Sequence, residues 1–187
     1  MPLNSFENRV YQIGVYDEYK EYEVVAKFYR PGRWSHNQLI EEHSFTFELV
    51  DFELPVIAPI RQDQASNFRV AQFQFAVLEK KGGRAPNLAD DAVLSWIGRL
   101  IGRIHAVSAT QPFEYRPTIN VEQFGRTPVR FIIENEFVPV ELREPYQGLV
   151  DLALTIIDTA FNQNQDCAFI RLLGDCHPGN ILWMEDG

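Results

Sequence analysis

The stretch Leu172–Trp183, LLGDCHPGNILW, contains the polar residues on which the interpretation of the whole chain depends. Asp175 and Asn180 are five residues apart, and apolar residues flank them on both sides. The pattern predicts a loop between two short strands, residues 168–173 and 181–184, with a proline-glycine turn that lets both polar side chains face one side. This arrangement suits phosphoryl transfer, because an acid can accept the proton of an attacking hydroxyl group while an amide oxygen holds a magnesium ion that bridges the phosphates.

Simpler interpretations of this loop compete with the catalytic one. Asp175 and Asn180 also fit an ordinary turn, since short polar side chains hydrogen-bond their own backbone. Asp175, Cys176 and His177 are metal-ligand types, but neighbouring residues at a strand end rarely converge on one ion, which argues against zinc. Cys176 has no basic neighbour that would activate its thiol as a nucleophile. His177 is expected to brace the loop by hydrogen bonds.

The composition is that of an acidic globular protein. The chain has 187 residues, 45% hydrophobic and 13% aromatic, which suffices for one domain or two small lobes with a packed core. The formal charge of −9 argues against a nucleic-acid partner, because such surfaces need clustered Lys and Arg. Cys167 and Cys176 match no disulfide framework and suit a reducing compartment. With no visible secretory signal, and no apolar run near the roughly 20 residues of a membrane span, we expect a cytoplasmic protein without a membrane partner.

The first 79 residues are expected to form a β-rich lobe. Four segments have strand-like composition and are separated by polar turns: residues 9–15, 21–30, 54–60 and 68–80. In the second segment, strand alternation places Lys27 on the same face as Val25 and Tyr29. Between the second and third segments, Ser35 followed by Gln38 matches a capping box and predicts a helix. Its apolar stripe is predicted to comprise Ile40, His43, Phe47 and Val50.

Residues 80–86 are expected to be a hinge, since two glycines and a proline end the strand pattern there. The remainder, residues 87–187, is expected to form a helical lobe. Asn87 is predicted to cap its first helix, whose stripe is Val93, Ile97, Leu100, Ile104 and Val107. Thr127-Pro128 opens a short helix, and residues 145–163 form a longer one. The stripe of the long helix comprises Leu149, Leu152, Ile156 and Ala160.

The sequence GDCHPGN, residues 174–180, resembles the H-G-D-x-H-x-x-N signature of the aminoglycoside phosphotransferase and choline kinase group of kinase-like enzymes. Leu173 departs from it, standing where the group usually has histidine. The segments VVAKFYRPGRW, LIEEHSF and RLLGDCHPGNILW extend the similarity, in order, to bacterial stress-response members that act on protein Ser/Thr. The resemblance implies an α+β, protein kinase-like two-lobe fold, with a β-rich N-lobe and a helical C-lobe, truncated at both ends.

The resemblance also implies roles for particular residues. Lys27 matches the strand lysine that contacts the α and β phosphates of ATP, and Glu42 matches the helix glutamate that pairs with it, with Glu41 as the alternative. Asp175 matches the catalytic base. Asn180 matches a ligand of Mg²⁺.

The adenine and phosphate contacts follow in the same way. Residues 4–9 lie where kinases carry a glycine-rich phosphate loop, but this segment has no glycine, so the side chains of Ser5 and Asn8 are expected to substitute. Glu79 opens the segment 79–83, whose backbone would hydrogen-bond adenine.

The resemblance implies an ATP- and magnesium-dependent phosphotransferase of the stress-response type, with a Ser or Thr hydroxyl group of a protein as the expected acceptor. A kinase of small hydroxyl substrates, such as an amino alcohol or a sugar, is the alternative within the same class. A nucleotide-binding module without catalysis is the alternative from another class, and Leu173 and the glycine-free phosphate loop favour it. The group's second metal-binding acid follows later than Asp186, so we expect this chain to be an inactive fragment that self-associates through its helical lobe.

Overall fold

The computed structural model describes residues 1–3, 7–16 and 21–184. The chain divides into two compact units, each considered by itself below. One unit combines Met1–Arg116 with Ile170–Gly187, and the other comprises Pro117–Phe169. The sequence-based boundaries of the lobes, at residues 79 and 87, stay a prediction.

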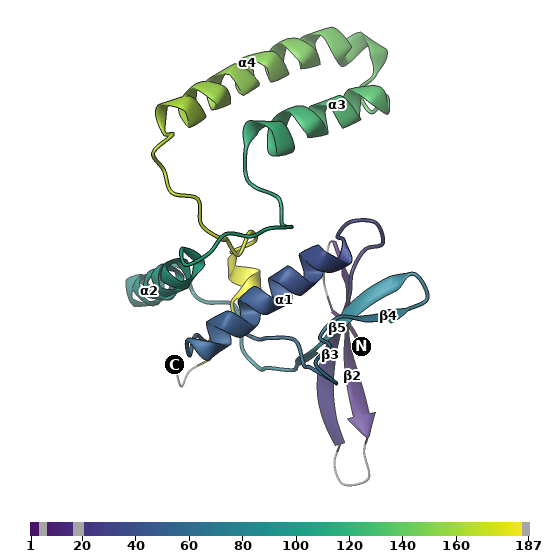
Figure 1. Cartoon of the computed structure of the whole chain (residues 1–187), viewed down its shortest axis with the longest axis vertical. Helices are drawn as coiled ribbons and strands as arrows, with labels where there is room; N and C mark the ends of the chain where they lie inside the picture. The colour runs from purple at the N-terminus through teal and green to yellow at the C-terminus, as the bar shows by residue number, and fades with distance from the viewer. Residues whose placement is uncertain (4–6, 17–20, 185–187) are drawn as a thin grey trace. The chain divides into compact units, whose positions relative to one another are not determined.

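An antiparallel sheet forms the first part of the larger unit (Figure 1). Its strands are β1 (Pro2–Leu3), β2 (Arg9–Tyr16), β3 (Glu21–Phe28), β4 (Phe68–Val70) and β5 (Phe73–Glu79), in the order β1-β2-β3-β5-β4. The first two predicted strands are therefore confirmed as β2 and β3. Because β3 is the middle strand, Lys27 has a strand neighbour on each side, Val10 and Ala76.

Two strand predictions were wrong. Residues 54–60, all of which the structure describes, make only the isolated bridge Pro59–Leu78, because their two prolines lack the N–H that a strand ladder needs. The predicted strand over 68–80 is a hairpin of β4 and β5, with a tight turn at Ala71, whose φ is 50°. Both segments have the apolar composition of strands, but composition alone does not show where prolines interrupt pairing or where a turn divides a strand.

Helix α1 (His36–Asp51) follows the sheet strand that carries Lys27 and begins as predicted. Ser35 Oγ accepts from the backbone N–H of Gln38 at 3.2 Å, and the Gln38 side chain accepts from the backbone N–H of Ser35 at 2.9 Å. Together these two bonds form the capping box.

The predicted apolar stripe of α1 was wrong except at His43. The buried residues are Leu39, His43, Phe45 and Leu49. The helix is covered on two faces: Leu39 packs with Tyr29 and Ala76 of the sheet region, whereas Phe45 and Leu49 join a second cluster with residues from the following helix. A single stripe cannot describe a helix enclosed on two sides.

Helix α2 (Asp91–Ser108) supplies that second cluster. Its predicted stripe is confirmed, with Val93, Ile97, Ile104 and Val107 buried and Leu100 partly buried against the cluster. The predicted cap was wrong: Asp90 accepts from the backbone N–H of Ala92, while Asn87 accepts from that of Ala89 one turn earlier. Both residues are good caps, and only the structure shows where the helix starts.

The smaller unit is helical. A π-helical turn (Glu122–Arg126) leads into α3 (Thr127–Glu134), which begins at Thr127-Pro128 as predicted, and a short turn at Val140–Leu142 leads into α4 (Arg143–Gln163). Figure 1 shows α3 and α4 side by side, and Arg126, the last residue of the π-helical turn before α3, forms an ion pair with Asp158 of α4. The predicted stripe of α4 is exposed, at 69% for Leu149 and 62% for Ile156. None of the described helices has the length and apolar character that crossing a membrane requires.

The segment before the polar loop also differs from its prediction. Residues 168–173 run without strand pairing, and residues 181–184 contribute only a bridge between Trp183 and Arg84. Arg171 explains the first difference, since its side chain and backbone are hydrogen-bonded to the end of α2 and to α1 rather than to a neighbouring strand.

The capping box provides the first test. Ser35→Ala is expected to destabilise the protein by about 1 kcal/mol, because the backbone N–H of Gln38 loses its acceptor. Urea unfolding of the purified protein measures the difference. Ser44→Ala, an exposed position in the same helix, is the matched control and should change stability by less than about 0.5 kcal/mol. Equal effects of the two substitutions would contradict the capping role.

Candidate active site

Lys27 and Glu42 form the first pair of the candidate site. The Lys27 ammonium on β3 lies 3.5 Å from Glu42 Oε1 on α1, and both side chains are about one third exposed. Lys27 also lies 5.1 Å from the centre of the Tyr29 ring. A lysine held between a carboxylate and an aromatic ring is fixed in place while its ammonium group remains accessible.

Glu41, the alternative partner, is directed elsewhere. Its carboxylate accepts the backbone N–H groups of Glu114, Tyr115 and Arg116, the last two at 2.9 and 2.7 Å. The segment that follows α2 is thereby attached to α1. The structure therefore pairs Lys27 with Glu42 and gives Glu41 a role in holding the backbone.

A buried histidine fixes α1 on the sheet beside this pair. The His43 ring lies between Tyr29 Oη at 2.8 Å and Ser66 Oγ at 2.9 Å. Burial lowers the pKa of His43 to about 4, so the ring is neutral at pH 7 and shares these hydrogen bonds without a charge. Burial likewise raises the pKa of the Tyr29 hydroxyl above its usual value.

Asp175 and Asn180 form the second pair. The Asn180 amide nitrogen donates to the Asp175 backbone carbonyl at 2.8 Å and to Asp175 Oδ2 at 3.1 Å. A 3₁₀ turn, Pro178–Asn180, brings them together. His177 braces the turn, since its Nδ1 accepts the backbone N–H of Gly179 at 3.1 Å and its Nε2 lies 3.7 Å from Asp175 Oδ2.

The donor set of this loop fits a hard cation. Asp175 accepts hydrogen bonds from the amide nitrogen of Asn180, and these bonds fix the orientation of the amide group. The amide oxygen of Asn180 is therefore directed away from Asp175. An amide oxygen beside a carboxylate is the ligand chemistry that magnesium prefers. Among the described residues there is no group of three or more His, Cys, Asp or Glu side chains placed to hold one metal ion.

A partly buried ion pair attaches the segment before Asp175 to α1. Arg171, only 3% exposed, donates to both carboxylate oxygens of Glu48, at 2.5 and 3.0 Å. The same guanidinium donates to the Val107 carbonyl at 2.9 Å and lies 4.4 Å from the centre of the Phe45 ring. Glu48 additionally accepts from Thr110 and Gln111. Helix α1 therefore carries Glu42 for Lys27 and Glu48 for the segment that leads to Asp175.

Sequence reasoning missed both Arg171 and Glu48. A signal was present, because Arg171 interrupts the apolar run AFIRLL and Glu48 stands between apolar residues in FTFELV. Charged residues are almost never fully buried without a partner, so two isolated opposite charges in apolar segments suggest a pair. Nothing in a single sequence indicates that these two segments meet, 123 residues apart.

The remaining predicted residues lie near the hinge and the phosphate-loop position. Ser5 lies outside the described residues, and Asn8, just before β2, is partly buried. Glu79 is the last residue of β5 and directly precedes the predicted hinge. Its side chain forms an ion pair with Lys81 at 2.9 Å.

Arg84, within the segment predicted to be a hinge, pairs with the segment after the loop. Arg84 and Trp183 exchange two backbone hydrogen bonds, at 3.1 and 2.7 Å. Gly83 adopts a φ of 140°, and a Cβ there would lie 2.9 Å from the Leu182 Cβ, so both the backbone and the space require glycine. The hinge and the residues following Asn180 are therefore in direct contact.

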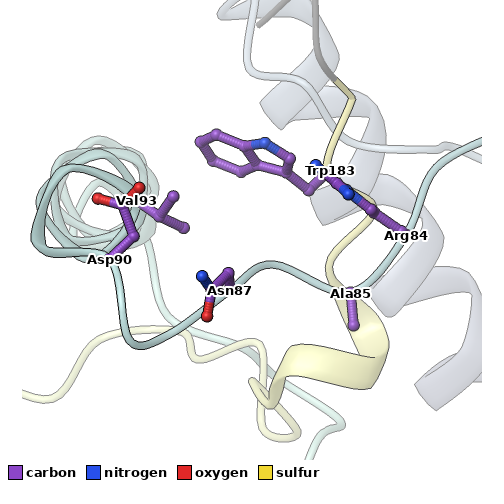
Figure 2. Close-up of a pocket in the computed structure, with 6 residues that line it drawn as sticks. All are labelled: Arg84, Ala85, Asn87, Asp90, Val93 and Trp183. Carbon is purple, nitrogen blue, oxygen red and sulfur yellow. The ribbon is translucent and has the colours of Figure 1, made fainter.

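A cavity of about 340 Å³ lies beside this contact, between the segment that precedes α2 and the start of α2 (Figure 2). Its lining residues are Arg84, Ala85, Asn87, Asp90, Val93 and Trp183. The Trp183 ring extends toward α2, where it meets Trp96 edge to face at 5.4 Å. The cavity is lined by Arg84 and Ala85 of the predicted hinge, but not by Lys27, Glu42, Asp175 or Asn180.

The fold and the two side-chain pairs define a kinase-like protein, an α+β fold with a strand lysine, a helix glutamate and an Asp/Asn loop. The chain belongs to the phosphotransferase enzyme family, whose model matches residues 1–187. The predicted kinase-like fold and the predicted family are thereby confirmed.

Curated relatives agree with this assignment. The chain is 35% identical over 184 residues to stress response kinase A of Escherichia coli (strain K12) and to serine/threonine protein kinase RdoA of Salmonella typhimurium. Each match covers 98% of this chain and 55% of the relative, so the chain spans about half the length of the curated relatives it matches.

A solved structure shows the same fold. Amicoumacin kinase hAmiN, in complex with AMP-PNP, Ca²⁺ and Ami, matches with a TM-score of 0.71 over 99% of this chain and 55% of that chain. The sequence identity is 17%, so the similarity concerns the fold.

The Glu48–Arg171 pair gives a pH-dependent test. The Arg171 guanidinium holds the folded-state pKa of Glu48 below its ordinary value, so the stabilisation is complete above the unfolded-state pKa, about 4.3, and is lost as the pH falls through the lower folded-state value. Glu48→Gln should therefore cost about 1–3 kcal/mol at pH 7 and progressively less in acid. Urea unfolding of both proteins from pH 7 to pH 3 measures this; parallel curves would contradict it.

Proposed function

We propose that the longer protein containing this chain is an ATP- and magnesium-dependent phosphotransferase. The observation that supports this most strongly is that α1 carries the partners of both parts of the site. Glu42 pairs with Lys27, and six residues further along Glu48 binds Arg171, four residues before Asp175. A nucleotide-binding lysine and a catalytic loop need a constant separation, and one rigid helix in contact with both provides it.

Each residue has a defined task in this proposal. Lys27 neutralises charge on the α and β phosphates, and Glu42 orients it. The backbone at Glu79 to Gly83 receives the adenine, and Asn8 and Ser5 contact the phosphates. Mg²⁺ would be held by Asn180 and would offset charge on the transferring phosphoryl group. Asp175 accepts the proton of the acceptor hydroxyl.

The proposed acceptor is a Ser or Thr hydroxyl of a protein. The support is the 35% identity to relatives named stress response kinase A and serine/threonine protein kinase. A small hydroxyl compound is the second candidate, because the same fold occurs in amicoumacin kinase. Incubating the full-length protein with labelled ATP and either a bacterial protein extract or a panel of amino alcohols and sugars separates the two.

The proposal also includes the location of the protein, its partners and the state of this chain alone. We place the protein in the cytoplasm with no nucleic-acid partner, consistent with its charge of −9. Activity is assigned to the longer protein and not to residues 1–187 alone. The exposed stripe of α4, with Leu149, Leu152 and Ile156 at 69, 59 and 62%, supports self-association of this chain when it is produced by itself.

The lysine gives the first test of this function. Lys27→Ala in the full-length protein should weaken binding of Mg·AMP-PNP by about 10- to 150-fold, since a charge-assisted contact to phosphate is worth about 1.5–3 kcal/mol. Isothermal titration measures the dissociation constant, and the melting temperature confirms folding. Arg69→Ala removes an exposed cation from strand β4 as the control and should leave binding unchanged. Unchanged affinity in Lys27→Ala would rule out a nucleotide site at this lysine.

The loop gives the second test. Asp175→Asn should slow phosphoryl transfer by about 10²–10⁴-fold, because the amide cannot accept the acceptor's proton. Nucleotide affinity should stay close to that of the unmodified protein. ADP release coupled to NADH oxidation measures the rate, with Asp166→Asn, an exposed acid earlier in the chain, as control. Near-normal turnover in Asp175→Asn would show that another group is the base or that transfer needs none.

A further inference from the structure

Glu42 is shared unequally between two cations. Arg116 Nη1 donates to Glu42 Oε2 at 2.8 Å, whereas the Lys27 ammonium lies 3.5 Å from Oε1. The shorter contact involves the less exposed cation, since the Arg116 side chain is 20% exposed and that of Lys27 is 31% exposed. Two cations on one carboxylate leave the cluster with a net positive charge.

Arg116 is itself fixed from several directions. Its backbone N–H donates to Glu41 at 2.7 Å, and its guanidinium lies 4.1 Å from the centre of the Trp34 ring. Trp34 packs against the buried cluster of Tyr29, Leu39 and Ala76. An arginine held by its backbone, its stacked face and its charge keeps a constant position.

We infer that Arg116 is a positioning residue for the nucleotide site, acting through Glu42. It fixes the carboxylate and occupies one of its two oxygens, so Lys27 is oriented by Glu42 without being bound tightly to it. The ammonium can then direct its donors to a phosphate. This inference rests on the proposed function, and it assigns to Arg116 a role that neither the strand lysine nor the helix glutamate can fill.

Geometry distinguishes this role from simple packing. If Arg116 only attached its segment to α1, the three backbone N–H groups bound by Glu41 and the bond from Gln38 Nε2 to the Tyr115 carbonyl at 3.0 Å would be sufficient. The guanidinium is directed instead at the carboxylate of Glu42, which also contacts Lys27. Its removal should therefore affect nucleotide binding and not only stability.

A double-mutant cycle tests the inference in the full-length protein. Arg116→Met, Glu42→Gln and the double variant are titrated with Mg·AMP-PNP. Each single substitution should weaken binding by about 10-fold, and the double variant should match the weaker single variant within about 2-fold, because both changes remove one interaction. Effects that multiply to about 100-fold would overturn the inference, as would normal binding by Arg116→Met.

Two further variants make the result specific. Arg116→Lys keeps a cation beside Glu42 and should bind within about 3-fold of the unmodified protein; binding as weak as that of Arg116→Met would overturn the inference. Arg61→Met is the matched control, since Arg61 stacks 3.6 Å from the centre of the Phe47 ring on the same helix. It should bind normally; a loss equal to that of Arg116→Met would show a general effect of disturbing α1 and would overturn the inference.

Failure of the proposed function is distinguishable from failure of this inference. If Lys27→Ala and Glu42→Gln weaken binding and Arg116→Met does not, only the role of Arg116 is wrong. If all three bind Mg·AMP-PNP normally, the nucleotide site itself lies elsewhere, and both conclusions are wrong. Melting temperatures of every variant show that the protein compared in each titration is folded.

Discussion

The ion pair between the buried Arg171 and the partly buried Glu48 is the constraint on which the arrangement of the larger unit depends. Removing a guanidinium and a carboxylate from water is costly, and the cost is offset only where the geometry is good and further hydrogen bonds complete the shell. Here the carboxylate is bound by both Nη atoms, and the carbonyl of Val107 and the ring of Phe45 complete the surroundings of the guanidinium. Because the pair joins positions 123 residues apart, the chain after residue 170 is fixed against a helix from its first third.

Helix α1 is consequently the element through which the candidate site is assembled. Its capping box fixes where it begins, and its apolar residues pack on the sheet on one side and on α2 on the other. Three glutamates of the helix make its polar contacts: Glu41 accepts from backbone N–H groups, Glu42 pairs with two cations and Glu48 pairs with Arg171. The helix is therefore in contact with both the sheet region and α2.

Sequence alone was sufficient where the signal is local. The capping box at Ser35, the stripe of α2 and the turn of Asp175 and Asn180 all depend on residues within a few positions of one another, and the structure has them. Sequence failed where tertiary contacts decide: the strand over 54–60, the stripe of α1 and the segment before the loop were wrong because prolines, a second packing face and a buried arginine outweigh local pattern. The preference for Glu42 over Glu41 came from family resemblance. The two adjacent residues are chemically identical, and only the direction in which each projects from the helix distinguishes them.

The contact between the hinge and Leu182 makes two neighbouring glycines unequal in how much sequence change they tolerate. Gly83 has a positive φ and lies against the Leu182 Cβ, whereas an added Cβ at Gly82 would meet no atom within 4 Å. In a library of random variants, position 82 should therefore accept many residues and position 83 almost none. A side chain at position 83 would displace the backbone after Asn180 as well as its own segment, because the atoms nearest to its Cβ would be the Cβ and Cα of Leu182 and the carbonyl oxygen of Trp183.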